Sequence, residues 1–443
     1  MRREDIPPHI VKLGLRLGAT DVVASLTEVE RFMVRFSNNE ITISKNYREA
    51  TVSIFLMIER HRAGSTLALP SMETLKEAVK RTVKMAKISP PAEVYAPLPE
   101  GPFKYDPELL KPPTIPINPR RLVRYVREAI DGALEMGARK AAGTLTATKI
   151  KKTLSTSGNV DAKQEKAGIE ISVRAFTSDV SSGQFVSIAT REEDFKPGEA
   201  GRIAGEIAKE ASNPIQGKPG RYTALLGPMV FADLVSEVGG LSSAFMVDIG
   251  SSFLIDKIGS EVAWEGFTLI DDPTLRGGYG LRAFDEEGVP TRRNVIVERG
   301  VLKTYLHNST TAKKFKTETT GNAGLINPTP WNLIVEPGDS SFEELLEEVD
   351  EGIYVTNDWY LRYQNYRTGD FSTIPRDGMF LIRDGRIDKP VRELRISDNM
   401  LRILKNIKAL SRERHWIRWW EVEVPTLTPY ALIDDLNFTK STM

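Results

Sequence analysis

Histidine and cysteine, the side chains most often used as metal ligands, general bases and nucleophiles, are scarce in this chain of 443 residues. Cysteine is absent, which excludes disulfides, thiolate metal sites and cysteine nucleophiles. The histidines are His9, His61, His307 and His415, and no two stand close enough in sequence to form an HExxH or HExxxH zinc motif. We therefore expect no zinc site in this chain.

The serine-rich segment 241–253, LSSAFMVDIGSSF, is a candidate for nucleophilic catalysis. A serine nucleophile needs a base and an oxyanion hole, and no G-x-S-x-G elbow surrounds these serines. We interpret the segment as a loop that follows a helix. His307 follows the strand-like run VLKTYL and is interpreted as an ordinary strand-end residue.

Glycines and carboxylates alternate in the segment 271–290, DDPTLRGGYGLRAFDEEGVP. The glycines could cradle an anion, and the carboxylates could bind a hard cation. The pattern G-x-x-x-x-G-K-[ST] is absent, so nucleotide binding is not supported. A long ordered loop is the favoured interpretation.

Two polar segments interrupt the strand-rich second half of the chain. The segment 319–338, TTGNAGLINPTPWNLIVEPG, places Thr320 and Asn322 beside glycines at the mouth of a strand. Such a place can present backbone donors to an extended ligand, or it can form a tight turn. The segment 366–373, YRTGDFST, is a similar polar break.

Arginine and tryptophan are interleaved near the C-terminus, in RERHWIRWWEVEVP at 412–425. This mixture can stack on nucleic-acid bases, and it is also typical of protein interfaces. Lys and Arg together number 60, as do Asp and Glu, so the formal net charge is zero. Nucleic-acid binders usually have a basic excess, so we favour an interface or core role for this segment.

Composition indicates a soluble globular protein, with 40% hydrophobic and 27% charged residues. The N-terminal residues MRREDIPPHIVKLG lack the apolar core of a signal peptide, and no window has the roughly 20 apolar residues of a membrane helix. Together with the lack of cysteine, these features predict a cytoplasmic location.

Hydrophobic periodicity predicts both strands and helices, which must position the polar segments. The turn SNNE at 37–40 indicates a hairpin, and the run GRYTALL is followed by a helix that begins at Pro228. Strands are predicted at 21–28, 31–38, 41–46, 50–61, 141–158 and 168–179, and helices at 7–18, 71–89, 120–136, 197–212, 341–352 and 397–410.

The two kinds of element are mixed without regular alternation, which predicts an α+β fold. The Pro-rich residues 89–119 cannot form a sheet or a long helix and are interpreted as a connector. We expect an N-terminal α/β domain at 1–88, this connector, a middle α+β domain at 120–216, and a strand-rich, sheet- or barrel-like C-terminal domain at 217–443.

A series of segments occurs in a characteristic order: SSFLIDKIGSEV at 251–262, the run from TLIDD to TAKKF at 268–315, TTGNAG at 319–324, YRTGDFS at 366–372 and VRELRISDNMLRILKNIKAL at 391–410. This order resembles that of the TldD/PmbA family, also called the modulators of DNA gyrase, in which the name PmbA is interchangeable with TldE. The N-terminal residues 18–46 are similar to the first domain of that family. The resemblance covers nearly the whole chain.

The resemblance implies one of two kinds of subunit. TldD-type chains carry HExxxH on a helix and a later cysteine, which together hold a catalytic zinc ion, whereas TldE/PmbA-type chains lack these ligands and pair with a TldD-type partner. Here the motif would fall near residues 234–239, at the positions Leu234, Val235, Glu237 and Gly239. Leucine and glycine cannot bind a metal, and Glu237 is out of register with the catalytic glutamate. The resemblance therefore implies a TldE/PmbA-type subunit.

The implied function is that of a partner in a zinc metalloprotease complex that processes unfolded peptides. We expect no cofactor in this chain, zinc in the TldD-type partner, a heterodimer or higher assembly, and no activity of the chain alone; a homodimer stays open. The residues predicted to line a groove for an extended peptide are Thr320, Gly321, Asn322, Gly369 and Asp370.

Two alternative functions stay open. The first is an autonomous peptidase with an unrecognised site, for instance His307 with carboxylates of the 271–287 loop. The second is a gyrase-associated or nucleic-acid-associated regulatory binding protein that uses the Arg/Trp segment, against which the zero net charge weighs.

Overall fold

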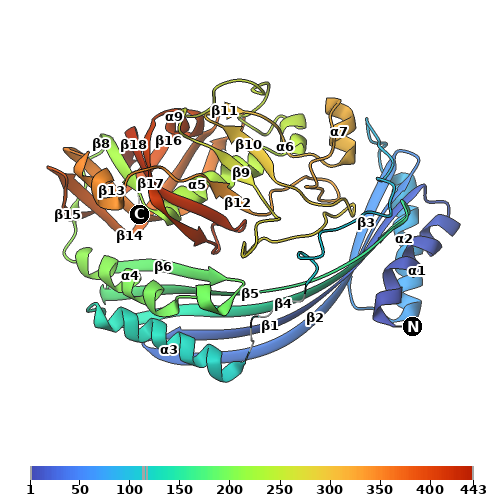
Figure 1. Ribbon diagram of the computed structural model, residues 1–443, viewed down its shortest axis with the longest axis horizontal. Helices are drawn as coiled ribbons and strands as arrows, with labels where there is room; N and C mark the ends of the chain where they lie inside the picture. The colour runs from blue at the N-terminus through green and yellow to red at the C-terminus, as the bar shows by residue number, and fades with distance from the viewer. Residues whose placement is uncertain (1, 112–114, 116–117, 442–443) are drawn as a thin grey trace.

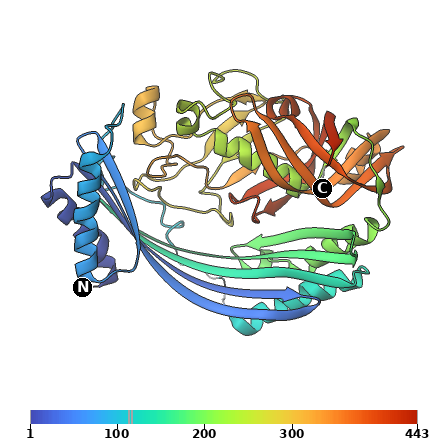
Figure 2. The ribbon, with the colours of Figure 1, turned by 180° about the vertical axis from the view of Figure 1, so that it is seen from behind.

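Two β-sheets organise the protein, which we describe from a computed structural model covering residues 2–111, 115 and 118–441. The first sheet has the strand order β3-β2-β1-β4-β5-β6. The second has the order β11-β10-β9-β12-β18-β8-β13-β14-β15-β7, with β16 and β17 joined beside this path. The first sheet is strongly curved, and the second lies over its concave side (Figures 1 and 2). Helices and strands are mixed in both halves, so the predicted α+β class is confirmed.

The first sheet is antiparallel and built from long strands. The predicted runs at 21–28 and 31–38 join into a single strand, as do those at 41–46 and 50–61, and the predicted hairpin turn lies between the two strands. Asn38 and Asn39 have φ angles of 50° and 67°, as two-residue hairpin turns require. The strands are β1 (Asp21–Ser37), β2 (Glu40–Ile58), β3 (His61–Ala68), β4 (Lys140–Thr156), β5 (Val160–Ser178) and β6 (Ser181–Ala189).

The segments 1–88 and 120–216 contribute to this same sheet, because β1 pairs with β2 on one side and with β4 on the other. The two segments that we treated separately in the sequence therefore share one sheet. The connector 89–119 joins them and lies partly outside the described residues.

The helices of this half pack on the outer face of the sheet. Even-numbered β1 residues between Val22 and Leu26 share a core with α1 and α2, and Val34 and Phe36 share another with α3 and α4. Ser71 and Asn118 cap two of these helices by accepting bonds from Thr74 N and Arg120 N. The predicted helices are confirmed as α1 (Ile6–Arg16), α2 (Met72–Ile88), α3 (Pro119–Glu135) and α4 (Pro197–Glu210), with short 3₁₀ turns η1 (Arg3–Asp5) and η2 (Glu192–Asp194).

Along strand β5, apolar side chains lie on one face of the first sheet and polar side chains on the other. The odd-numbered residues from Ala167 to Ala175 are buried in the core shared with α3 and α4. The side chains of Gln164, Glu170 and Arg174, at even positions, instead bond to residues 283, 418 and 377 of the C-terminal half. Because side chains alternate along a strand, a polar row faces the second sheet.

The second sheet surrounds α5, which packs against β18 and β13 within a large apolar core. This helix begins at Pro228 directly after β8, as predicted. The helices of this half are α5 (Pro228–Leu241), α6 (Ala244–Asp248), α7 (Ser309–Phe315), α8 (Phe342–Glu347) and α9 (Met400–Lys405). The strands are β7 (Ile215–Gln216), β8 (Gly220–Leu226), β9 (Leu269–Asp271), β10 (Asn294–Glu298), β11 (Val301–Leu302), β12 (Leu333–Val335), β13 (Glu351–Asn365), β14 (Asp370–Arg383), β15 (Arg386–Arg392), β16 (Leu394–Asn399), β17 (Ile407–Ile417) and β18 (Thr426–Lys440).

The helix predicted at 397–410 is wrong in most of its length. Only α9 is helical, with Asn399 as its cap, and β17 begins at Ile407. Ile407 and Leu410 are buried and pair with Ile433 and Ala431 of β18. Pairing with a distant strand therefore overrides the local helical pattern.

Within the described ranges, no helix has both the length and the apolar character needed to cross a membrane.

Candidate functional site

Helix α5 holds the four positions that the sequence singled out as the degenerate motif. Leu234 and Val235 are buried in the apolar core. A Cβ atom added to Gly239 would lie 2.5 Å from Leu333 Cδ1, so this glycine permits close packing against β12. Glu237 is half-buried. Leu234, Val235 and Gly239 thus serve packing, and Glu237 is the one polar side chain of the four.

A buried pair of carboxyl groups lies one turn before Glu237. Asp233 on α5 and Asp358 on β13 are 1% and 0% exposed. Thr373 Oγ1 donates to Asp358 Oδ2 at 2.8 Å. In the described part of the chain, Asp233 Oδ2 and Asp358 Oδ1 have no donor, and a proton shared between the two carboxyls would satisfy both.

Burial is the main cause of the pKa shifts in this pair. It raises the pKa of Asp233 well above its usual value, and the neighbouring charges of Asp358, Glu237 and Glu421 raise it further. Burial also raises the pKa of Asp358 to about 8, although the Thr373 hydrogen bond opposes the shift. At least one proton is therefore held by the pair at neutral pH.

Glu237 and Glu421 extend the acid pair into an acidic cluster. Burial raises the pKa of Glu237 to about 7, Arg362 lowers it and Glu421 raises it. Arg362 also forms an ion pair with Glu421 at 3.5 Å. Zinc sites in proteins use thiolate, imidazole and carboxylate ligands in a tight tetrahedral set, and no group of three His, Cys, Asp or Glu residues is so arranged in the parts of the chain that the structure describes. The acidic cluster does not fit zinc.

An aromatic cluster adjoins the acidic cluster at Tyr360 and Glu421. The Trp420 ring lies 5.3 Å from those of Trp359 and Trp419 and 5.4 Å from that of Tyr360. Tyr360 has a φ of 61°, unusual for an aromatic residue, and its N–H donates to Glu421 Oε1 at 2.5 Å. The Arg/Trp segment thus packs within the protein through Trp419 and exposes Trp420.

The arginines of that segment also bind within the chain. Arg412 pairs with Glu344 at 3.0 Å, Arg414 donates to Val335 O at 3.1 Å, and Arg418 pairs with Glu170. These contacts agree with an interface or core role.

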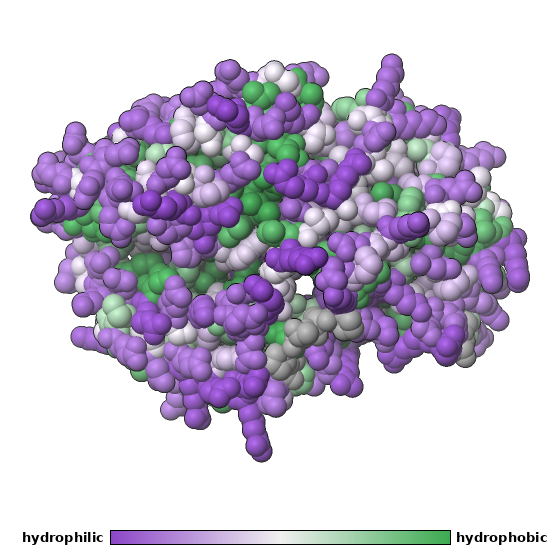
Figure 3. Space-filling view, in the orientation of Figure 1, coloured by the Kyte–Doolittle hydropathy of each residue, from purple (hydrophilic) through white to green (hydrophobic). Residues whose placement is uncertain are grey.

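A cavity of about 580 Å³ lies between the concave face of the first sheet and the C-terminal half. We call it the central cavity. The space-filling view shows a small opening between the two halves of the molecule, with hydrophilic side chains directly above it and to its right (Figure 3). The volume is in the range of small-ligand sites. Its walls include Arg31, Tyr47, Thr148, Lys166 and Glu170 of the first sheet and Tyr279, Arg282, Trp331, Arg418 and Glu423 of the C-terminal half.

Strand register builds the sheet wall of the central cavity. Tyr47, Arg31, Thr148 and Gly168 stand opposite one another across β2, β1, β4 and β5. Because Gly168 has no side chain, the Tyr279 ring can approach the sheet at this point. Tyr279 then donates from its hydroxyl to Glu170 Oε2 at 3.2 Å.

The charges of the central cavity are only partly matched. Glu170 pairs with Arg418, and Arg282 pairs with Glu286, which lies outside the lining and also binds Lys152. Glu423, in the lining, forms no ion pair with any described residue. The Arg282 guanidinium also lies 3.8 Å from the centre of the Trp331 ring, a cation–π contact.

Lys166 has no hydrogen bond or ion pair with any residue for which the structure gives a position. Burial lowers its pKa to about 7; the charges of Arg282, Lys152 and Arg418 lower it further, and Glu286 opposes them. A lysine with this pKa changes its charge near neutral pH.

The predicted groove residues Thr320, Gly321 and Asn322 lie behind the cavity wall. Thr320 Oγ1 accepts from His307 N at 2.8 Å, and Asn322 Nδ2 donates to Asp271 Oδ2 at 2.6 Å. Gly321 O accepts from Trp331 Nε1 at 3.1 Å. These residues therefore support the segment that presents Trp331, while direct contact with a peptide stays a prediction.

Gly369 and Asp370 lie at the turn between β13 and β14. Gly369 has a φ of 85°, which favours glycine. Asp370 accepts from Thr368 Oγ1 at 2.6 Å and from Asn399 Nδ2 at 2.9 Å, and these bonds lower its pKa. Among the described residues, no hydrogen bond or ion pair joins this turn to residues 319–322, and its contact with a peptide is likewise still a prediction.

The 271–290 segment is an ordered loop held by its own carboxylates. Asp271 accepts from the N–H groups of Trp331 and Asn332, each at 2.8 Å. Glu287 accepts from Ser309 Oγ at 2.7 Å. His307 is 3% exposed with its Nδ1 3.3 Å from Thr311 Oγ1, and burial lowers its pKa to about 4. The groups that set this histidine's pKa include no carboxylate.

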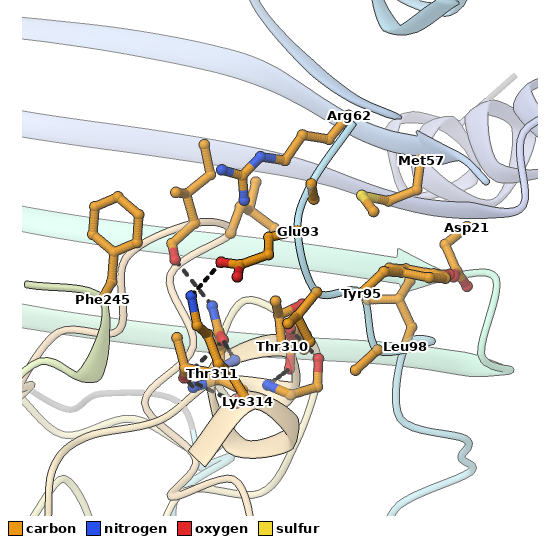
Figure 4. A pocket seen from close by; sticks show the side chains of 18 of the residues that line it. Asp21, Met57, Arg62, Glu93, Tyr95, Leu98, Phe245, Thr310, Thr311 and Lys314 are labelled. Carbon is orange, nitrogen blue, oxygen red and sulfur yellow. Dashed lines mark hydrogen bonds and ion pairs between the residues drawn. The ribbon is translucent and has the colours of Figure 1, made fainter. Parts of the chain in front are cut away.

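A second cavity, of about 230 Å³, lies between the far end of the first sheet and α7. Figure 4 shows Lys314 at its centre, reaching toward Glu93. The Lys314 ammonium pairs with Glu93 at 2.6 Å and with Asp248 at 2.7 Å. Its central cation is thus already matched by two carboxylates, unlike Lys166 in the central cavity.

The close approach of Gly168 to Tyr279 gives a testable prediction. A Cβ atom at residue 168 would lie 2.5 Å from Tyr279 Cε2. Gly168→Ala is expected to lower the free energy of unfolding by about 1–3 kcal/mol through overpacking. Gly240→Ala is the control, because its Cβ would meet nothing within 4 Å, and it should be neutral or slightly stabilising in chemical denaturation. Equal midpoints for the two variants would contradict the packing role of Gly168.

Sequence reasoning missed Asp233, Asp358 and the charged lining of the central cavity. Two signals were available: Asp233 lies four residues before Glu237 on an otherwise apolar helix, and β5 carries polar or small residues at every even position from 164 to 174. Neither signal identifies what faces these residues, since their partners come from distant segments.

The chain resembles known proteins in sequence. A model of the PmbA/TldA metallopeptidase C-terminal domain matches residues 219–440. A metalloprotease of Methanocaldococcus jannaschii is 34% identical over 224 residues, 48% of this chain and 48% of that protein. A metalloprotease PmbA homolog of Haemophilus influenzae is 25% identical over 415 residues, 90% of this chain and 89% of that protein. The alignment with the first of these relatives thus spans about half of its length.

Two solved structures share the fold over nearly the whole chain. A putative modulator of DNA gyrase from Thermotoga maritima has a TM-score of 0.85 at 24% identity, covering 99% of this chain and 100% of that one. TldE from Thermococcus kodakarensis has a TM-score of 0.84 at 22% identity, covering 98% and 100%. At these identities the likeness concerns the fold.

Proposed function

Because this chain belongs to the PmbA/TldA metallopeptidase family, as its segment order indicated, we propose that it is the TldE/PmbA-type subunit of a zinc metalloprotease complex. In this proposal a TldD-type partner carries HExxxH and the zinc ion, and the complex processes unfolded peptides in the cytoplasm. The present chain contributes walls of the substrate space and performs no hydrolysis alone.

The chemistry of α5 is the observation that carries the proposal. At the place expected for the zinc motif, the helix has an apolar packing face, with Leu234 and Val235 in the core. Its acidic residues Asp233 and Glu237 lie beside Asp358 and Glu421, whose charges raise the pKa values of the cluster. Carboxyls that hold protons at neutral pH are poor ligands for a divalent cation.

The central cavity supports a role in holding peptide. Its walls combine the aromatic rings of Tyr279 and Trp331 with charged side chains from both halves of the molecule. Aromatic surfaces can pack on a peptide of varied sequence, and polar groups can fix its ends. An unfolded chain can enter a space of this size, and a folded domain cannot.

The test is a cleavage assay with an unfolded fluorogenic peptide. We expect the purified chain alone to hold no stoichiometric zinc and to cleave no peptide, and the mixture with a TldD-type partner to show cleavage that a chelator abolishes. The matched control is the same partner with the glutamate of its HExxxH replaced by glutamine. Chelator-sensitive cleavage by this chain alone would contradict the proposal.

A further inference from the structure

We propose that the central cavity binds the carboxylate of a peptide through Lys166 and Arg31. The inference rests on the proposed function and deepens it, because it assigns a chemical preference to the substrate space.

Lys166 and Arg31 are the unmatched cations. Of the carboxylates in or beside this cavity, Glu170 pairs with Arg418, and Glu286, outside the lining, pairs with Lys152 and Arg282. Glu423 lines the cavity near Arg418, whose pKa its charge raises, and forms no ion pair with Lys166 or Arg31. By contrast, the described residues provide no carboxylate within ion-pair distance of Lys166 or Arg31.

Arg31 also has a donor without an acceptor. Its Nη1 donates to Tyr47 Oη at 2.8 Å, which holds the guanidinium against the sheet. Its Nε is buried and finds no acceptor in the described part of the molecule. A buried N–H of a charged group is costly to leave unpaired, so an acceptor from a ligand or from water is expected there.

The strands bring the two cations to one side of the cavity. Arg31 stands in register with Thr148 and Gly168, and Lys166 is two residues from Gly168 on the same face of β5. Two strand spacings and a two-residue offset place their Cα atoms about 12 Å apart. Both side chains are long and line the cavity, so their charged ends can meet on one anion.

A carboxylate suits this site better than a larger anion. Two cations, one of them titrating near neutral pH, match a single negative charge, and a guanidinium is well shaped for carboxylate oxygens. The neighbouring Tyr279 and Trp331 rings offer apolar surface to the residue that carries the carboxylate. The C-terminal carboxylate and an acidic side chain share this chemistry, and the experiment separates them.

Binding should depend on pH through Lys166. The charged groups that face it are Arg282, Lys152 and Arg418, which lower its pKa, and Glu286, which opposes them, and the result is a pKa of about 7. An anion that binds only the protonated lysine should lose about tenfold in affinity from pH 6 to pH 8. Binding should also take up a proton above pH 7.

The experiment is calorimetric titration of the full chain with N-acetyl-trialanine, compared with its C-terminal amide and with an amidated peptide that ends in aspartate. We expect the free acid to bind at least tenfold more tightly than the trialanine amide. The aspartate peptide binds like the free acid if an acidic side chain suffices, and like the amide if the site needs a C-terminus. Either of these two results is consistent with a carboxylate site.

Three variants make the test specific. Lys166→Met should weaken the free acid at least tenfold, and Lys166→Arg should keep the affinity while abolishing proton uptake, measured in two buffers of different ionisation enthalpy. Lys149→Met is the matched control. Lys149 is an exposed lysine of β4 that follows Thr148, so its side chain lies on the opposite face of the sheet from the cavity. We expect this variant to bind the free acid as the wild type does. The Arg variant keeps the test valid if the Met variant fails to fold.

Equal binding of acid and amide, wild-type affinity of Lys166→Met, or tighter binding of inorganic phosphate than of the free acid would overturn the inference. None of these outcomes would contradict the proposed function, because that function is tested separately, by peptide cleavage with the TldD-type partner. Failure of that cleavage, with the acid preference intact, would instead remove the protease role and leave the carboxylate site.

Discussion

Arg174→Met is expected to lower the free energy of unfolding by about 3–5 kcal/mol, because it leaves a buried carboxylate without its counter-ion. Arg174 Nε on β5 donates to Asp377 Oδ1 on β14 at 2.6 Å, and the Asp377 side chain is fully buried. Ser182 Oγ also donates to this carboxylate, at 2.5 Å. The pair joins the two sheets, so its loss should weaken their attachment as well as the local structure.

The measurement is guanidinium chloride denaturation followed by tryptophan fluorescence. Arg202→Met on α4 is the control, because Arg202 is exposed and its nearest carboxylate, Glu135, is 3.9 Å away. This control should stay within about 0.5 kcal/mol of wild type. Combining Arg174→Met with Asp377→Asn should recover part of the loss by removing the unpaired charge. A loss below about 1 kcal/mol for Arg174→Met would show that the pair is not structural.

Asp358→Asn is expected to flatten the dependence of stability on pH. Burial raises the pKa of Asp358 to about 8 in the folded protein, against about 4 for an exposed aspartate. The folded chain therefore binds this proton more tightly than the unfolded chain. As pH rises from about 4 to about 8, the free energy of unfolding falls, and below pH 4 the group makes no difference.

Asparagine at this position keeps an acceptor for Thr373 and offers an N–H donor to Asp233 without titrating. The variant should be more stable than wild type by roughly 2–4 kcal/mol at pH 8 and close to it at pH 4.5. Thermal unfolding across this pH range measures the difference. Asp179→Asn, at an exposed turn between β5 and β6, should keep the wild-type slope. An unchanged slope in Asp358→Asn would mean that the pair does not share a proton.

Local patterns were sufficient for much of the fold. The helices α1 to α5 and the β1–β2 hairpin could be predicted because caps, proline positions and apolar periodicity act within a few residues of chain. The 397–410 segment failed for the opposite reason: Ile407 and Leu410 satisfy a helical pattern, yet their partners lie on β18. That the segments 1–88 and 120–216 share one sheet likewise depends on distant pairing, here of β1 with β4.

The sequence by itself determined the family resemblance, the α+β class and the absence of cysteine and of histidine from α5. These are properties of residue type and order, and no folding can change them. Only the tertiary structure decided that Asp233 lies beside Asp358 and that Lys166 and Arg31 share a cavity with Trp331. Charge state depends on burial and on neighbours, and both come from strand register and packing between segments far apart in the chain. For that reason residue order alone does not show which carboxyls form the buried pair or which cations line the central cavity.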